Sequence, residues 1–340
     1  MQLKGVKGAS LSVRLLRGTK QPVTAVRISE DEKTVYSASK DCCVVKWDLE
    51  SGDRLAVYRG KKDRKEAEKL PGHNNHVLSL ALSSDGKFLA SGGKDKLILI
   101  WDTEKNALRD AFKGHKDSVT ALAFRLGSHD LYSGSDDRTL KLWNVDEMSY
   151  MDTLFGHKAE ITAIDALTRE RPVTSSMDKT AAVWKVADEV HLEYLGPKTN
   201  LFSIALLNED IFVTGGQDGS IQLWSTQKRK PLFTFTLAHG HAPKDAFNWI
   251  TSLGALRYSD LFASGSATGE IRLWKLSEKK DSFTLVNRIP MKGVVNSLQF
   301  SKTGKYLIAG VGQEPRMGRW IRIADAKNGT AIILLDQQQH

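Results

Sequence analysis

Tryptophan recurs along this chain at intervals of about 40 to 50 residues, a spacing typical of repeat proteins, and each of these tryptophans ends a similar segment. In five of the seven segments an aspartate stands six positions before the tryptophan, as in SGGKDKLILIWD and SGSDDRTLKLWN. Self-similarity at such a period indicates a repeat architecture, in which every copy forms the same supersecondary unit. The tryptophans are Trp47, Trp101, Trp143, Trp184, Trp224, Trp274 and Trp320.

Apolar residues alternate before each acidic turn, in stretches such as HVLSLALS, SVTALAF and EITAIDAL, and this pattern predicts a strand. Three of these strands follow a Gly-His pair that ends four residues earlier, at His73, His115 and His157. The combination resembles the WD-repeat family over nearly the whole chain. That resemblance implies an all-β, seven-bladed propeller with four antiparallel strands per blade. We expect residues 1–340 to form this one domain.

Both ends of the chain contain a strand-like segment for the last blade. LSVRLLRG near the N-terminus and TAIILLD near the C-terminus are each candidates for its outer strand, and we favour the N-terminal one. We interpret GVGQEPRMGRWIRI, residues 310–323, as the strand, turn and strand of the seventh repeat. In this interpretation residues 313–316 replace the aspartate turn, and Trp320 closes the repeat.

Histidine, serine or threonine, and aspartate occur together in three of the repeats, and a hydrolase triad uses the same residue types. A catalytic site is built once, whereas a network that stabilises each blade is repeated, so repetition favours a structural role and a non-enzymatic protein. In WD repeats, as the resemblance implies, these side chains and the tryptophan are hydrogen-bonded within one blade. The three sets are His73, Ser91, Asp95 and Trp101; His115, Ser133, Asp137 and Trp143; and His157, Thr174, Asp178 and Trp184.

Metal and membrane signals are weak. His239 and His241 have no further ligands at a characteristic spacing, so we expect a solvated pair and neither a metal nor a cofactor site. The neighbouring Cys42 and Cys43 lack the C-x-x-C spacing. No apolar run reaches the roughly 18 residues that a membrane helix needs, and we expect a soluble intracellular protein. The formal net charge of +9 favours contact with polyanions.

Two insertions interrupt the regular spacing, both just before the first strand of a blade. They include RGKKDRKEAEKLPG at 59–72 and AHGHAPKDAFN at 238–248, and propeller geometry places both on the face that carries the aspartate turns. The first insertion is basic. Its sequence fits two interpretations, a solvated surface loop or a contact site for RNA or an acidic protein. Candidate contacts are Lys61, Lys62, Arg64 and Lys65 in this insertion, with Gln313, Arg316, Arg319 and Arg322 near the C-terminus; Arg316 is the strongest single candidate.

Four segments match one branch of the WD-repeat family more narrowly. They are YSASKDCCVVKWDLESG at 36–52, VLSLALSSDGKFLASGGKDKLILIW at 77–101, SYMDTLFGHKAEITAIDALTRERPVT at 149–174, and NSLQFSKTGKYLIAGVGQEPRMGRWIRI at 296–323. These segments resemble the family of the 55K WD-repeat protein of the U3 small nucleolar ribonucleoprotein. The last segment is the most specific, because few propellers replace the seventh turn in this way.

The resemblance implies a subunit that binds the box B/C element of U3 snoRNA together with the small kink-turn-binding protein called 15.5K. It further implies work in maturation of 18S ribosomal RNA with other small-subunit processome proteins, in the nucleolus of the nucleus. The family usually carries a basic N-terminal extension, which this sequence lacks before the first blade, so either the sequence is trimmed or targeting works otherwise. The alternative is a protein-only adaptor, such as a histone reader or a ubiquitin-ligase substrate receptor, that uses the same face.

Overall fold

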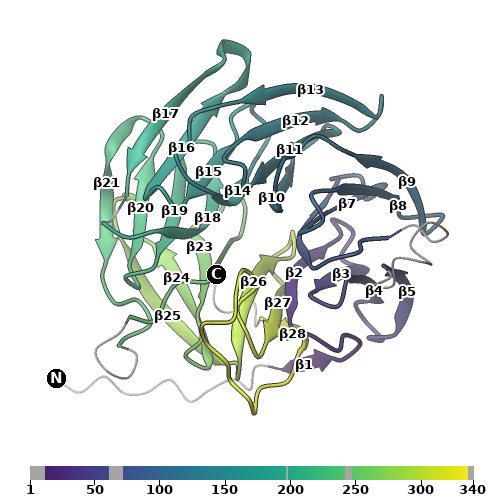
Figure 1. The fold of residues 1–340 in the computed structure, drawn as a ribbon. Helices are drawn as coiled ribbons and strands as arrows, with labels where there is room; N and C mark the ends of the chain where they lie inside the picture. Colours follow the sequence, from purple (N-terminus) through teal and green to yellow (C-terminus); the bar gives the residue numbers. More distant parts are fainter. Residues whose placement is uncertain (1–11, 61–71, 197, 242–246, 336–340) are drawn as a thin grey trace.

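The computed structural model describes residues 12–60, 72–196, 198–241 and 247–335. Within these ranges the chain forms seven four-stranded antiparallel sheets that are arranged around a central axis (Figure 1). A single turn of 3-10 helix, η1 (Val186–Asp188), interrupts the strands between β16 and β17. From the innermost to the outermost strand, the first three sheets are β2 (Val23–Ile28), β3 (Thr34–Ser39), β4 (Cys43–Asp48) and β5 (Arg54–Arg59); β6 (Val77–Leu82), β7 (Phe88–Gly93), β8 (Ile98–Asp102) and β9 (Ala107–Phe112); and β10 (Val119–Phe124), β11 (Asp130–Ser135), β12 (Leu140–Asn144) and β13 (Ser149–Leu154).

The other four sheets continue the ring in sequence order. They are β14 (Ile161–Asp165), β15 (Val173–Ser176), β16 (Thr180–Lys185) and β17 (Val190–Leu195); β18 (Leu201–Asn208), β19 (Ile211–Gly216), β20 (Ile221–Ser225) and β21 (Lys228–Phe235); β22 (Ser252–Ala255), β23 (Leu261–Gly265), β24 (Glu270–Leu276) and β25 (Phe283–Pro290); and β26 (Val294–Phe300), β27 (Tyr306–Gly312), β28 (Gly329–Leu334) and β1 (Val13–Leu16).

The hydrophobic core lies between neighbouring blades. The innermost strands contact one another in a closed circle, from β2 through β6, β10, β14, β18 and β22 to β26 and back to β2. One core cluster, for example, joins Ile100 and Phe112 of one blade to Leu122 and Trp143 of the next. Because both faces of each sheet are covered in this way, inner strands such as β10 are buried along their whole length. The all-β, seven-bladed propeller that the resemblance to WD repeats implied is therefore confirmed.

The two ends of the chain meet in the last sheet. Strand β1 pairs antiparallel with β28, with Val13 opposite Ile333, so the N-terminal segment is the outer strand. The C-terminal segment does not compete for this place, because it forms the third strand of the same blade. Ile333 lies opposite Leu307 there, as Trp143 lies opposite Leu131 in the blade of β10. Ile333 thus occupies the position of the closing tryptophan.

The interpretation of the seventh repeat is therefore wrong in one respect. Strand β27 ends at Gly312 and β28 begins at Gly329, so residues 313–328 are a loop between the two middle strands. Trp320 lies in this loop and is 43% exposed, instead of closing a strand. Trp320 was predicted to close the repeat because it follows Glu314 by the same six residues that separate tryptophan and aspartate in other repeats.

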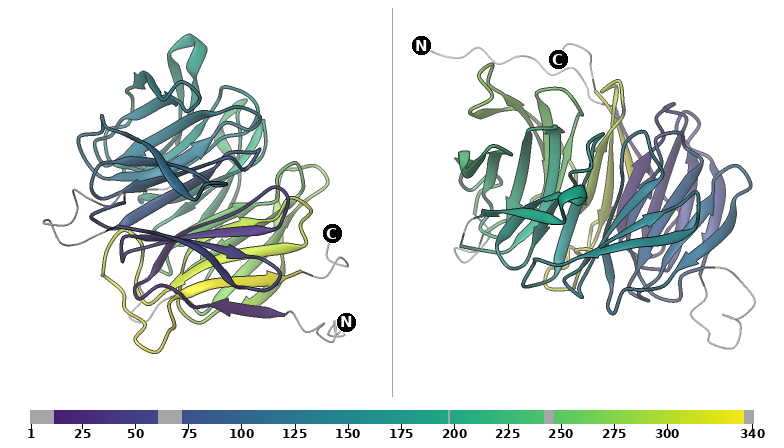
Figure 2. Two further views of the ribbon diagram at one scale, coloured as in Figure 1. Left: turned by 90° about the vertical axis from the view of Figure 1, so that its right-hand side faces the viewer. Right: turned by 90° about the horizontal axis from the view of Figure 1, so that it is seen from above.

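The loops define two faces of the ring (Figure 2). On the entry face lie the loops that lead into the innermost strands and the turns between the two middle strands of each blade. On the exit face lie the turns that follow the innermost strand and those that precede the outermost strand. Backbone bonds join the two kinds of exit-face turn, as from Thr103 N to Lys87 O at 3.0 Å. The 313–328 loop belongs to the entry face.

Candidate nucleic-acid interface

One hydrogen-bonded chain of side chains runs through the blade of β10. The Nδ1 atom of His115 lies 2.9 Å from Asp137 Oδ2, and its Nε2 atom lies 2.7 Å from Ser133 Oγ. The indole of Trp143 donates to the same Ser133 oxygen at 2.8 Å. Distances are nearly the same in the two other predicted sets, which comprise His73, Ser91, Asp95 and Trp101, and His157, Thr174, Asp178 and Trp184.

Burial and charge suit these sets to a structural role. Ser133 is fully buried, so no substrate reaches its hydroxyl. Burial works to raise the pKa of Asp137, but hydrogen bonds from His115 and Thr139 outweigh it and hold that pKa below its ordinary value. The carboxylate also accepts the backbone N–H groups of Lys116 and Thr139, which ties the entry loop to the turn.

A fourth set joins these three, and it corrects our expectation for His239. His239 is 3% exposed, and its ring nitrogens lie 2.8 Å from Ser264 Oγ and 3.0 Å from Thr268 Oγ1. The Ser264 oxygen also accepts the Trp274 indole, as in the other blades. Burial lowers the pKa of His239 to about 3, and the nearby positive charge of Arg272 adds to this effect. His241, in contrast, is exposed.

A sequence signal for this fourth set was present. Ser264 stands ten residues before Trp274, the spacing that also separates serine or threonine from tryptophan in the three predicted sets. The insertion before β22 lengthens the separation from His239 to Ser264, so the usual histidine spacing is lost. Among the described residues no group of histidine, cysteine and carboxylate side chains is placed to hold a metal ion.

The 313–328 loop is held by its own polar groups. Gln313 donates from Nε2 to the carbonyl oxygens of Ala324 and Ala326 at 2.9 and 3.0 Å. Its backbone N–H donates to Asn328 Oδ1 at 2.9 Å, which joins the two ends of the loop. The Gln313 side chain that we expected to face RNA is thus engaged inside the loop.

Arg316 points into the central channel. Its guanidinium donates to the carbonyl oxygens of Thr120 at 3.1 Å, Leu78 at 3.5 Å and Thr162. These three acceptors are the second residues of β10, β6 and β14, so one side chain bridges three consecutive blades. Burial lowers the pKa of Arg316 to about 10, which leaves it charged near neutral pH. The structure thus gives Arg316 protein carbonyls as partners, where we expected contact with RNA phosphate.

Asn296 extends the same connection to the first blade. Its Nδ2 atom donates to Val23 O at 2.9 Å and to Glu314 O at 3.0 Å, while its Oδ1 atom accepts the Arg316 N–H at 2.9 Å. Asn296 belongs to β26 and Val23 to β2, which are the innermost strands of the last and first blades. The base of the loop therefore links the two blades at which the ring closes.

The outer part of the loop faces solvent. The Arg319 side chain is 71% exposed and lies 3.2 Å from a carboxylate oxygen of Glu314, which also contacts the buried Lys40 at 3.6 Å. Lys40 in turn donates to Gly318 O at 2.9 Å. Arg322 is also exposed. The loop thus displays Arg319 and Arg322 on the entry face.

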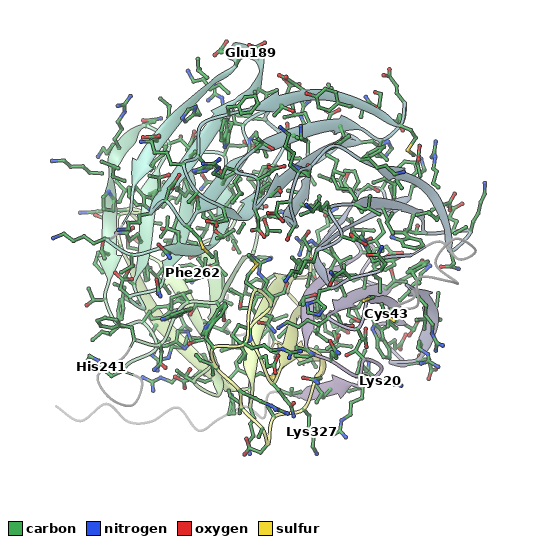
Figure 3. All side chains as sticks on the ribbon, in the orientation of Figure 1. Lys20, Cys43, Glu189, His241, Phe262 and Lys327 are labelled. Atoms are coloured by element: carbon green, nitrogen blue, oxygen red, sulfur yellow. The ribbon has the colours of Figure 1, made fainter. Side chains whose placement is uncertain are left out.

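The entry face as a whole is basic. Among its described residues, the exposed carboxylates are Asp117 and Asp325. The other described carboxylates of this face are partly buried in the turns. Lys20 and Lys327 lie near each other at one edge of the ring (Figure 3). The exposed cations of this face are Arg17, Lys20, Lys94, Lys96, Lys113, Lys116, Arg138, Lys158, Lys179, Lys198, Lys292, Arg319, Arg322 and Lys327.

The exit face carries charges of both signs. Exposed cations such as Arg169 and Arg171 alternate there with many exposed carboxylates. A polyanion is therefore attracted to the entry face more strongly than to the exit face. The exposed carboxylates of the exit face include Asp31, Glu50, Asp53, Glu104, Asp146, Glu147, Glu170, Asp188, Glu189, Glu278 and Asp281.

Four of the predicted contacts belong to the first insertion. Lys61, Lys62, Arg64 and Lys65 lie outside the described residues. The segment is bounded by β5, which ends at Arg59, and by the buried His73. Both ends of the insertion therefore belong to the entry face.

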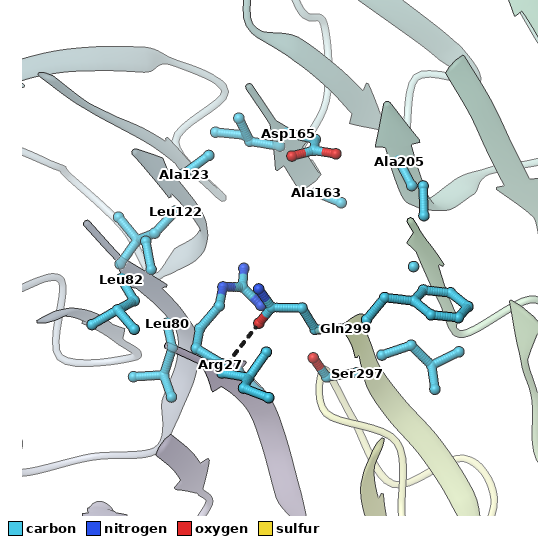
Figure 4. Close-up of a pocket in the computed structure, with 18 of the residues that line it drawn as sticks. Arg27, Leu80, Leu82, Leu122, Ala123, Ala163, Asp165, Ala205, Ser297 and Gln299 are labelled. Atoms are coloured by element: carbon cyan, nitrogen blue, oxygen red, sulfur yellow. Dashed lines mark hydrogen bonds between the residues drawn. The ribbon is translucent and has the colours of Figure 1, made fainter. Parts of the chain in front are cut away.

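The central channel forms a cavity of about 640 Å³ beneath the 313–328 loop. Arg27 and Gln299 point into it from β2 and β26, and Asp165 lies across from them (Figure 4). Gln299 accepts the Ile28 N–H at 3.0 Å. Burial lowers the pKa of Arg27 to about 10, and the Asp165 carboxylate offsets part of that shift. The negative charge of Asp165 thus faces the positive charge of Arg27 across the channel (Figure 4).

Known proteins share this architecture. The model of the WD domain, G-beta repeat, matches residues 10–48, 64–102 and 106–144. The human U3 small nucleolar RNA-interacting protein 2 is 45% identical over 96% of this chain and 70% of its own length. Ribosomal RNA-processing protein 9 of Saccharomyces cerevisiae is 29% identical over 89% of this chain and 67% of its own length. A solved structure of U3-55K is 44% identical, with a TM-score of 0.91, and covers 95% of this chain and 98% of that one. No helix among the described residues has the length and apolar character that crossing a membrane requires.

Proposed function

The chain belongs to the family of U3 small nucleolar RNA-interacting WD-repeat proteins, and from this membership we propose that it is a non-enzymatic scaffold subunit of the U3 small nucleolar ribonucleoprotein. Its work is then in processing of the ribosomal RNA precursor to 18S ribosomal RNA, in the nucleolus. Independently of the relatives' names, the proposal is supported by the basic entry face and by the 313–328 loop that hydrogen bonds hold in place there. Exposed cations around a rigid ring supply the phosphate contacts that RNA binding needs.

We propose that the RNA partner is the box B/C region of U3 snoRNA, bound together with the small kink-turn-binding protein. A rigid propeller suits such a composite surface, because phosphate contacts supply affinity while a neighbouring protein supplies selectivity. Other proteins of the small-subunit processome would then bind elsewhere on the ring. The exit face, with its exposed carboxylates, is the surface we assign to protein neighbours.

The internal contacts of the loop refine the set of RNA-binding residues. We assign phosphate contact to Arg319 and Arg322, together with Lys61, Lys62, Arg64 and Lys65 of the first insertion. Gln313 and Arg316 support the interface by holding the loop, since their polar atoms are engaged by protein groups. The repeated histidine sets hold the turns of the same face.

A salt series tests this function. The purified chain is titrated with box B/C RNA, with and without the kink-turn-binding protein, at several salt concentrations. We expect binding that weakens steeply with salt, and each of Arg319→Ala and Arg322→Ala should reduce the slope of log K against log salt by about 1. Arg169→Ala is the matched control, because Arg169 is an exposed arginine of the exit face.

Absence of RNA binding under both conditions would refute the proposal. A partner captured with weak salt dependence and retained after nuclease treatment would instead support the protein-only adaptor. Equal loss of binding in Arg169→Ala and Arg319→Ala would show that RNA does not select the entry face.

A further inference from the structure

An aromatic cluster with one exposed ring, that of Trp320, lies on the entry face beside the basic loop. Trp320 contacts Trp249 with ring centroids 5.1 Å apart and Phe202 at 6.4 Å, and Phe202 and Trp249 are stacked on each other at 5.1 Å. Phe202 belongs to β18, Trp249 precedes β22, and Trp320 comes from the loop of the last blade. The cluster therefore joins three consecutive blades at the channel mouth.

Burial falls from the base of this cluster to its tip. Phe202 is 8% exposed, whereas Trp320 remains 43% exposed although two aromatic rings pack against it. The neighbouring Ile321 is 36% exposed, and Phe247 nearby in sequence to Trp249 is 45% exposed. A large apolar group that is held rigidly and left open to solvent marks a surface for a partner.

The local structure fixes the indole in place. A side chain at Gly318 would meet Trp320 at once, since an added Cβ would lie 2.0 Å from its Cζ3 atom. Lys40 holds the Gly318 carbonyl, and Glu314 holds Arg319 on the other side of that glycine. The tryptophan is thus preorganised, so that binding a flat ring against it costs little conformational entropy.

Charge decides which partner fits. Arg319 and Arg322 flank Trp320 in the sequence and are both exposed, and the surrounding face is basic. An aromatic ring between guanidinium groups is the arrangement that binds single-stranded nucleic acid, with the base on the ring and phosphates on the cations. We propose that Trp320 is a stacking site for one unpaired base of the bound RNA. This inference rests on the proposed function and specifies how the entry face recognises its RNA.

Stacking and phosphate contact respond differently to salt, and this difference provides the first test. Dissociation constants for the complex of box B/C RNA and the kink-turn-binding protein are measured across a salt series. We expect Trp320→Leu to weaken binding about 5- to 100-fold, with the salt slope unchanged. Trp320→Phe should retain most of the affinity, and Phe155→Leu is the matched control because Phe155 is an exposed aromatic residue of the same face.

A double-mutant cycle identifies the base. Each unpaired nucleotide of the RNA is replaced in turn by an abasic residue and bound to wild type and to Trp320→Leu. We expect one abasic position to weaken binding to wild type and to add nothing in Trp320→Leu, because both changes remove the same contact. Thermal unfolding of Trp320→Leu and Trp320→Phe monitors the fold of the loop.

The outcomes separate this proposal from the proposed function. If wild type binds and Trp320→Leu binds within twofold of it, the stacking site is wrong and the RNA-binding function stands. Additive losses at every abasic position would likewise overturn the stacking site, and would assign the aromatic cluster to the kink-turn-binding protein. If wild type binds no RNA, both proposals fail together.

Discussion

Arg316→Ala removes the side chain that joins three blades at the channel mouth. In the structure this guanidinium donates to the carbonyl oxygens of Thr120, Leu78 and Thr162. The contact to Leu78 is long, at 3.5 Å, so two hydrogen bonds carry most of the effect. A hydrogen bond from a charged donor contributes about 1.5 to 3 kcal/mol.

Two effects make the loss of stability smaller than the summed contribution of the two hydrogen bonds. Water can enter the channel and bond to the exposed carbonyl oxygens, and the variant no longer buries a charged group. We therefore expect Arg316→Ala to lower the free energy of unfolding by about 2 to 3 kcal/mol. For a chain of 340 residues, the average unfolding entropy per residue converts this loss into a decrease in Tm of about 3 to 4 °C. Arg316→Lys should lose an intermediate amount, since one ammonium group cannot reach all three blades.

Thermal unfolding and RNA titration together test this reasoning. Arg322→Ala is the matched control, because Arg322 is an exposed arginine of the same loop and should leave Tm unchanged. The reasoning is refuted if Arg316→Ala unfolds within about 1 °C of wild type while its RNA affinity decreases and its salt slope falls by about 1. That result would show that Arg316 contacts phosphate, as the sequence alone had suggested.

Three further predictions concern stability. His239 is protonated near pH 6.5 in the unfolded chain but only near pH 3 in the folded chain. The free energy of unfolding should therefore fall by about 2 to 3 kcal/mol between pH 7.5 and pH 4.5. Denaturant titrations that show the same pH dependence for wild type and His239→Gln would contradict this. Ser133→Ala leaves two buried ring nitrogens, of His115 and Trp143, without their hydrogen-bond partner and should cost about 2 to 4 kcal/mol in urea unfolding. A loss below about 1 kcal/mol would exclude a stabilising network. Because β1 closes the ring, Leu16→Ala should lower the free energy of unfolding by about 2 to 4 kcal/mol. Val13→Ala on the same strand should lower it little, since Val13 is 42% exposed.

The sequence predicts those features that depend on local spacing. The number of blades follows from the repeated turns, and the three histidine sets follow from constant separations such as that between Ser133 and Trp143. These separations are constant because the two middle strands of each blade pair through a short turn, so residues ten apart lie on neighbouring strands. His239 was missed because an insertion changed its separation from Ser264, although it still contacts that serine, and because Thr268 stands where the other sets have an aspartate.

Other features depend on contacts that no local pattern encodes. Arg316 bonds to backbone carbonyl oxygens on three distant strands, and any residue type at those positions offers the same acceptor. Trp320 repeats the spacing of a closing tryptophan, yet Ile333 occupies that position, because β27 pairs with β28 and not with the segment around Trp320. Only the assembled ring shows that Trp320 contacts Trp249 and Phe202.

Pairing of β1 with β28 also sets an order of events during synthesis. Val13 leaves the ribosome 320 residues ahead of its partner Ile333, an interval on the order of 15 to 60 s at ordinary elongation rates. Six sheets can therefore form while β1 waits without a partner. The last sheet is completed in one late step that joins the first and last of the described strands, and such non-local pairing is slow. During that interval the waiting strand can pair with another chain, so a delay at the last blade exposes the nascent protein to misassembly.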